Sequence, residues 1–183
     1  MKHFKIYLLV MAAAVLLAAC SSDEEKPSYM PMVASAMNAT VYVEVIDGDK
    51  AVSPTEMLYE CRFSVFGQAS KRTKGVTAEK LNGTDVFCFW PDLPDFKVMK
   101  FWETDEGRRG EGYSDATITV DGVKTNLRFH FEYSALPNAD KMLGGNSLDL
   151  KTVEWQGKSI DPLVHGTQFK IVLRKQGQGF SVE

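Results

Sequence analysis

The chain has few of the residues from which catalytic sites are usually built. It contains three histidines, and after the first twenty residues only His130 and His165 remain, so side chains that titrate near neutral pH are scarce. The sequence has no Gly-x-Ser-x-Gly nucleophile motif, and no HxH, HExxH or CxxC spacing indicates a metal site. We therefore expect a protein that is not an enzyme and that binds no metal and no cofactor.

Two further features are missing from the chain. After residue 20 no apolar run approaches the roughly 18 residues that a membrane-spanning helix needs. The 21 Lys and Arg residues are also outnumbered by 24 Asp and Glu, for a formal net charge of −3. Because contacts with phosphate groups need a basic surface, nucleic acid is not an expected partner.

The first twenty residues have the pattern of a targeting segment. Lys2 and Lys5 precede an apolar run, Ile6–Leu17, which is too short to cross a bilayer comfortably and has the flanks of a cleaved signal. The run ends in Leu17-Ala18-Ala19-Cys20, which resembles the lipobox of bacterial lipoproteins. The resemblance implies that residues 1–19 are a signal peptide and that the Cys20 thiol carries diacylglycerol.

The residues directly after Cys20 suggest where the protein is exported. Ser21-Ser22-Asp23-Glu24-Glu25 resembles the surface-export signal of Bacteroidetes lipoproteins. This resemblance implies an outer-membrane protein exposed on the cell surface, whose partner is the membrane through the N-terminal lipid alone. Two acyl chains, usually joined by a third, are sufficient for stable anchoring.

The rest of the chain divides into a tether and one domain. Residues 20–37 mix charge, proline and small residues without a period, so we expect a flexible, lipidated tether. Residues 38–183 are enough for one domain with its own core. Within it, alternation of apolar and polar residues predicts strands at 41–46, 58–66, 84–90, 97–103, 116–132, 147–155, 158–160 and 167–175.

The segments between these strands carry turn signals. Ser53-Pro54-Thr55-Glu56 has the form of a capping box and predicts a short helical turn. Residues 67–83 are predicted to form a long loop with one helical turn at 78–81, and residues 103–112 an exposed flexible loop. The pattern favours an all-β, antiparallel sandwich of immunoglobulin-like type, and a closed barrel of lipocalin type is the alternative.

One hairpin can be predicted with its register. Asp121-Gly122 is a pair preferred in a type I′ turn, and it separates two alternating runs. Pairing of Val120 with Val123 places Phe129 and Phe131 on the core face and leaves His130 on the solvated face.

The two cysteines after Cys20 both fall in predicted strands and are expected to point inward. Cys61 shares a face with Phe63, and Cys88 shares one with Trp90. In an oxidising compartment they either form a disulfide between the sheets or remain two small buried hydrophobes.

Exposed aromatic residues provide the best indication of a binding site. Trp90 and Trp102 flank a proline-rich connection, Pro91–Asp95, and a tight turn there would bring both rings to one end of the sandwich. Flat rings in shallow sites stack on sugars or anchor protein partners, although both tryptophans could equally belong to the core. We interpret Asp92 and Asp95 as turn residues and not as calcium ligands.

These features favour a non-catalytic, lipid-anchored surface protein that binds a glycan or a surface protein, or serves as a fimbria-type subunit. The alternatives are a barrel that carries a small ligand and a secreted hydrolase. The lipobox, the tether and the sandwich pattern together resemble fimbrillins. The first arginine after Cys20 is Arg62, however, inside a predicted core strand. The tether thus offers no arginine cleavage site, which implies a monomeric or capping subunit and not a polymerising one.

Overall fold

The computed structural model describes residues 28–139, 144–163, 168–177 and 179–182. None of the helices in this part of the chain is long and apolar enough to cross a membrane. The expected signal peptide at 1–19, the lipidation site Cys20 and His165 lie outside the described residues.

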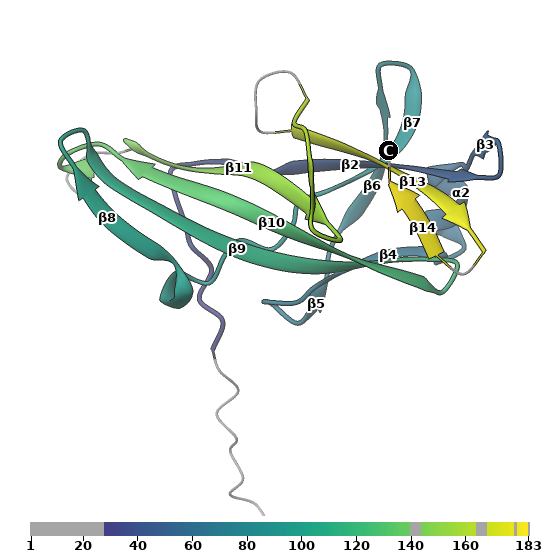
Figure 1. Cartoon of the computed structure of the whole chain (residues 1–183), viewed down its shortest axis with the longest axis horizontal. Helices are drawn as coiled ribbons and strands as arrows, with labels where there is room; N and C mark the ends of the chain where they lie inside the picture. The colour runs from purple at the N-terminus through teal and green to yellow at the C-terminus, as the bar shows by residue number, and fades with distance from the viewer. Residues whose placement is uncertain (1–27, 140–143, 164–167, 178, 183) are drawn as a thin grey trace, which may run out of the picture.

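The protein is all-β, with two sheets, as the alternation predicts. The larger sheet has the order β1 (Ala36–Asn38), β11 (Asn146–Trp155), β10 (Val123–Ala135), β9 (Gly107–Val120), β4 (Phe63–Gly67) and β5 (Arg72–Thr73), with β12 (Lys158–Ile160) on β11 and β8 (Lys100–Thr104) on β9. The smaller sheet has the order β14 (Gly179–Val182), β13 (Gln168–Gln176), β2 (Thr40–Asp47), β7 (Thr84–Phe89) and β6 (Val76–Leu81), with β3 (Lys50–Ala51) on β2. Figure 1 shows that β8 to β11 extend well beyond the smaller sheet at one end of the molecule.

Not every strand pair is antiparallel, and this corrects the expectation from the sequence. β1 runs parallel to β11, and β13 runs parallel to β2. Parallel neighbours need long crossover connections. Here the partners come from opposite ends of the chain, which no local pattern can reveal.

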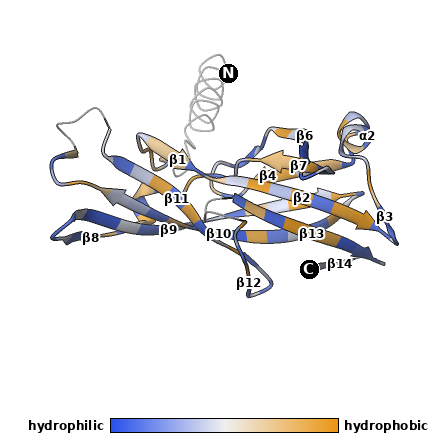
Figure 2. Cartoon of the chain, turned by 90° about the horizontal axis from the view of Figure 1, so that it is seen from above, coloured by the Kyte–Doolittle hydropathy of each residue, from blue (hydrophilic) through white to orange (hydrophobic). Residues whose placement is uncertain are grey.

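The predicted hairpin is confirmed in its register and its faces. Val120 pairs with Val123, and Asp121 adopts a positive φ of 50° in the turn. Phe129 and Phe131 are fully buried, and the ring of Phe129 meets that of Phe89 edge to face at 6.3 Å between centroids. Apolar and polar residues also alternate along β2 and β13 (Figure 2), so the core lies between the two sheets.

The chain between β3 and β7 departs from the prediction. Ser53 caps a helix as expected, but this helix, α2, continues to Tyr59, so the strand starts only at Phe63. The predicted loop at 67–83 contains β5 and β6 instead, and the helical turn at 78–81 is wrong. β6 is an edge strand with mostly exposed side chains, so it lacks the alternation that reveals a half-buried strand.

The predicted flexible loop at 103–112 is also wrong, because this segment forms the β8–β9 hairpin. Its glycines serve close packing and not mobility. A Cβ at Gly110 would collide with the ring of Phe101, and a Cβ at Gly112 would collide with the side chain of Met99. Glycine within a strand often marks such a close approach.

Residues 28–37 are part of the domain and not of a tether. Met32 is buried, and its amide donates to the Pro94 carbonyl at 2.9 Å. The segment then continues into β1, which pairs with β11. It covers the connection from β7 to β8, which contains a short 3-10 helix, η1 (Phe96–Val98).

Candidate functional site

A pocket with a mainly apolar lining lies where three separate segments of the described chain meet. It has a volume of about 400 Å³, which falls within the range of small-ligand sites. We call it the Trp90 groove. Its lining residues come from the N-terminal segment, from the β4–β6 connection and from the end of β7: Tyr29, Pro31, Met37, Ala39, Ser70, Arg72, Thr73, Lys74, Gly75, Trp90, Pro91, Asp92 and Leu93.

A buried ion pair holds two of these segments together. Asp92 is only 1 % exposed, and its Oδ1 lies 2.8 Å from the Nζ of Lys74. The other carboxylate oxygen accepts the backbone N–H of Ser70 at 2.8 Å, and the Asp92 carbonyl accepts the hydroxyl of Ser114 at 2.6 Å. A carboxylate removed from water needs such partners, because an unpaired buried charge costs several kcal/mol.

The end of β4 leaves room for this carboxylate. A Cβ at Gly67 would collide with the carboxyl group of Asp92, so a side chain at position 67 would displace the ion pair. The hydroxyl of Ser70 is buried and has no hydrogen-bond partner among the described residues. Buried polar atoms usually have one, so the Ser70 hydroxyl is an exception among the polar groups around Asp92.

One wall of the groove is apolar and aromatic. Trp90 is 58 % exposed just after β7. The hydroxyl of Tyr29 donates to the carbonyl of Leu93 at 2.7 Å, which attaches the N-terminal segment to this wall. Burial, together with the negative charges of Asp92 and Asp95, raises the pKa of Tyr29 to about 12, so the Tyr29 hydroxyl is a neutral donor at physiological pH.

The charge of the groove is positive. Lys74 is neutralised by Asp92, whereas Arg72 is exposed and has no ion-pair partner in the described part of the chain. The groove thus combines an exposed aromatic ring with one uncompensated guanidinium. Such a site suits a ligand with an apolar ring face and a carboxylate.

Trp102 lies elsewhere, so the structure does not bring the two predicted tryptophans together. It is 46 % exposed on β8 and lines a hollow of about 290 Å³ with Arg109, Glu132, Asp149 and Lys151. The two basic groups there already pair with acidic neighbours, Arg109 with Glu106 at 2.9 Å and Lys151 with Asp149 at 3.7 Å. The lining on this open sheet face is mainly polar, whereas that of the Trp90 groove is mainly apolar.

A larger hollow of about 480 Å³ lies on the outer face of β9, β10 and β11. Several of its polar side chains already form hydrogen bonds within the protein. The side-chain amide of Gln68 donates to the hydroxyl of Thr117 at 2.8 Å, and Nε of Arg128 donates to Asp115 at 3.0 Å. We place the candidate site in the Trp90 groove because its guanidinium and its ring are still free to bind.

Of the two alternatives for the cysteines, the disulfide is not formed, since Cys61 and Cys88 are both free thiols. Cys61 follows α2 at a positive φ of 55° and is exposed, because the helix replaces the expected strand. Cys88 is buried on the face of β7 opposite the core-facing Phe87 and Phe89. Burial and a hydrogen bond with Glu79 raise the pKa of this thiol to about 11, so it is protonated at neutral pH.

His130 is the described histidine of the two considered from the sequence. It lies on the outer face of the hairpin, as predicted, but its side chain is only 18 % exposed. Its Nε2 is buried with no hydrogen-bond partner among the described residues, 3.9 Å from a carboxylate oxygen of Glu111, and its ring stacks on Tyr113. Within the described residues no three His, Cys, Asp or Glu side chains form a cluster that would hold a metal ion.

Sequence reasoning missed most of the groove. Asp95 does act as a turn residue, because it accepts the Lys97 amide at the start of η1, but Asp92 is a buried member of an ion pair. The sequence predicts that Tyr29 lies in a tether and that Arg72 and Lys74 lie in a loop. The partner of Lys74 is Asp92, 18 residues further along the chain, a contact that no local pattern reveals.

Comparison of the chain with protein-family models, with curated proteins and with solved structures found no match.

Proposed function

We propose that the protein is a non-catalytic, lipid-anchored protein of the bacterial cell surface that binds a carboxylated glycan in the Trp90 groove. The observation that carries this proposal is the exposed ring of Trp90 in the same groove as the unpaired guanidinium of Arg72.

The ring and the cation recognise different parts of such a ligand. The face of an indole packs on the apolar face of a sugar ring. A guanidinium binds a carboxylate through two parallel hydrogen bonds, which a neutral sugar cannot accept with the same strength. Among neutral and acidic sugars of similar shape, the groove therefore favours the acidic ones.

The fixed role of Asp92 supports a binding protein over a hydrolase. It is the only carboxylate among the described residues that line the groove, and Lys74 and Ser70 already engage both of its oxygens. Glycosidases generally use two carboxylates at a defined separation. Asp92 serves in our proposal to hold the groove in shape.

The attachment to the outer membrane is proposed from the N-terminal sequence alone. The lipobox at Leu17-Ala18-Ala19-Cys20 and the acidic residues after it support lipid anchoring and surface export. We also assign the fold to the sandwiches of immunoglobulin-like type and not to closed lipocalin barrels. The support is that the described strands form two separate sheets with their own edges.

Two ligands of the same sugar that differ only in charge test the binding proposal. Isothermal titration with oligogalacturonate and with its fully methyl-esterified form compares the same sugar with and without its carboxylates. We expect the acid to bind at least about tenfold more tightly than the ester, as a charge-assisted hydrogen bond of 1.5–3 kcal/mol implies.

Four variants locate that binding. Trp90→Ala and Arg72→Gln should each weaken the binding of oligogalacturonate about tenfold or more, whereas Trp102→Ala and Arg109→Gln on the open sheet face should not change it. Equal affinity for the acid and the ester would exclude a carboxylate ligand. Equal losses in the two pairs of variants would exclude the Trp90 groove.

The anchor is tested separately by Cys20→Ala. This variant should lose acyl labelling and release from the membrane any protein whose signal has been cleaved. A cleaved, unlabelled protein that stayed on the membrane would contradict lipid anchoring.

A further inference from the structure

Three exposed apolar side chains gather where the described chain begins. The amide of Phe96 donates to the carbonyl of Met30 at 2.8 Å, and Pro31 forms a β-bridge with Asp95. These contacts place Met30 beside η1, which carries Phe96 and Val98. We call Met30, Phe96 and Val98 the Met30 patch.

The patch is open to solvent. Val98 is 71 % exposed, Met30 49 % and Phe96 40 %. A single exposed apolar residue on a surface is ordinary, but three of them on two paired segments concentrate exposed apolar side chains in one place, which is common at interaction sites.

The position of the patch relative to the lipidated cysteine identifies its occupant. The described chain starts at Ser28, whose carbonyl accepts a hydrogen bond from the Nζ of Lys97 in η1 at 2.9 Å. Ser28 is eight positions after Cys20, and a fully extended chain of eight steps spans roughly 26–29 Å at most. The lipid on Cys20 therefore keeps Ser28, and the patch beside it, within that distance of the membrane.

We infer that the Met30 patch rests on the lipid surface to which Cys20 is attached, so that the domain sits on the membrane in one orientation. This inference rests on the proposed lipid anchor. Lys97, between Phe96 and Val98 in η1, is also exposed, and apolar residues beside lysine are typical of surfaces that lie at a membrane interface.

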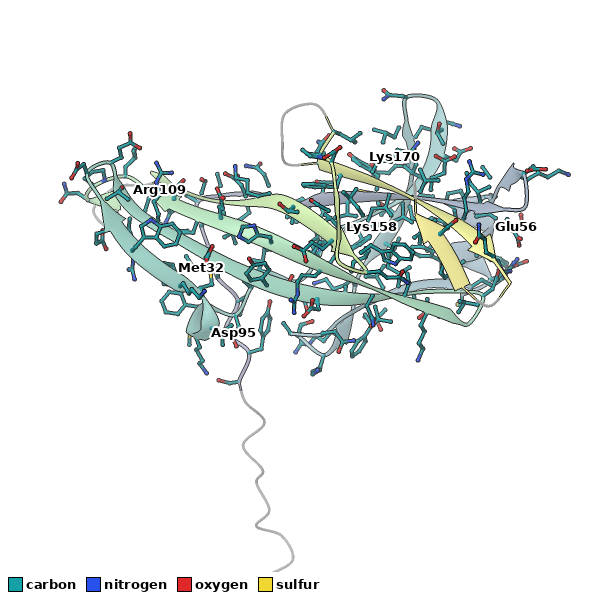
Figure 3. All side chains as sticks on the ribbon, in the orientation of Figure 1. Met32, Glu56, Asp95, Arg109, Lys158 and Lys170 are labelled. Carbon is teal, nitrogen blue, oxygen red and sulfur yellow. The ribbon has the colours of Figure 1, made fainter. Side chains whose placement is uncertain are left out.

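A segment far from the patch provides an internal control. Figure 3 shows labelled Asp95 beside the start of the described chain and labelled Glu56, in α2, well away from it at the right-hand end of the molecule. Tyr59, also in α2, is 90 % exposed. It is as accessible as Val98 but lies far from the expected membrane contact.

The experiment uses the full, processed lipoprotein in vesicles of phosphatidylethanolamine and phosphatidylglycerol. In a Cys61→Ser background, Val98→Cys, Met30→Cys and Tyr59→Cys are each labelled with an environment-sensitive fluorophore, and Cys88 is buried and should stay unlabelled. Intact mass first establishes that Cys20 is acylated. We then expect a blue-shifted emission, quenched by brominated lipid, at positions 98 and 30 but not at position 59.

The outcomes separate the two proposals. Absence of the acyl mass would contradict the lipid anchor itself. An acylated protein in which positions 98 and 30 are no better quenched than position 59 would overturn the membrane contact and leave the anchor intact. Equal quenching of all three positions would also overturn it, because the domain would then have no preferred face.

Discussion

Trp90 and Trp102 are similarly exposed, yet their surroundings differ in kind. Trp90 stands in a groove with an apolar wall, a buried ion pair and an unpaired arginine. Trp102 lies on an open sheet face whose basic side chains, Arg109 and Lys151, already pair with acidic neighbours. Exposure of an aromatic ring therefore does not by itself define a binding site. The uncommitted polar groups around the ring do.

The ion pair of the groove also differs from one on the outer face of the large sheet. The side chains of Asp92 and Lys74 are 1 % and 24 % exposed, whereas those of Asp115 and Arg128, on the outer face of β9 and β10, are 46 % and 55 % exposed. Solvent screens the exposed pair. The buried pair fixes the geometry of the groove, and that difference can be measured.

The largest effect on the free energy of unfolding is expected when the carboxylate of the groove ion pair is removed, with the exposed pair as the comparison. Asp92→Ala leaves the Lys74 ammonium and the Ser70 amide without their acceptor and should lower the free energy of unfolding by about 3–5 kcal/mol. Asp115→Ala should lower it by about 0–1 kcal/mol. Urea denaturation of the two variants and the parent gives both values, and similar losses would mean that Asp92 is no more buried than Asp115.

Two glycine variants test the same packing with a smaller expected loss in the free energy of unfolding. Gly67→Ala directs a methyl group against the Asp92 carboxylate and should cost about 1–3 kcal/mol through overpacking. In Gly75→Ala, also in the groove, the new methyl group has no atom within 4 Å, so the change should stay within about 0.5 kcal/mol. If both variants unfold at the same urea concentration, Asp92 does not lie against β4 as described.

Sequence reasoning succeeded where the signal was local and repeated. The β9–β10 hairpin has a turn pair between two alternating runs, so its register and its buried phenylalanines could be predicted from the residues alone. Ser53 as a helix cap was equally visible. The extent of α2 was not, because residues 58 and 59 also fit the alternation of a strand, and the predicted position of Cys61 was wrong for that reason.

The groove could not be predicted because its parts are distant in sequence. Asp92 between two prolines is typical of a turn, and only the fold brings it to Lys74. The N-terminal residues 28–37 have no hydrophobic period, yet Met32 is buried by tertiary contact. The sequence left open whether Trp90 and Trp102 are exposed or buried, and the structure exposes both; their separation depends on how residues 91–99 cross the molecule.

A smaller effect on the stability of the fold is expected from ionisation of Tyr29 at alkaline pH. Its pKa is about 10 in the unfolded chain and about 12 in the folded one, so between these values the unfolded state loses a proton that the folded state keeps. The stabilisation is fully present below pH 10 and is lost as the pH rises toward 12.

Tyr29→Phe has no such proton and should show a shallower fall in stability between pH 10 and 11. The raised pKa of Cys88 affects both chains equally and cancels in the comparison. Thermal unfolding of the two proteins at pH 8, 9, 10 and 11 provides the slopes. Parallel slopes would mean that Tyr29 is not buried against the apolar wall.

The most direct test of the proposed site is to determine which tryptophan a bound acidic glycan shields from a quencher. Two chains are compared, Trp102→Phe and Trp90→Phe, and each retains the buried Trp155 as a shielded reference. Iodide quenching is measured with and without oligogalacturonate. We predict that the ligand protects the first chain, which keeps Trp90, and leaves quenching of the second unchanged. Protection of the chain that keeps Trp102, or of neither chain, would contradict the assignment of the Trp90 groove as the binding site.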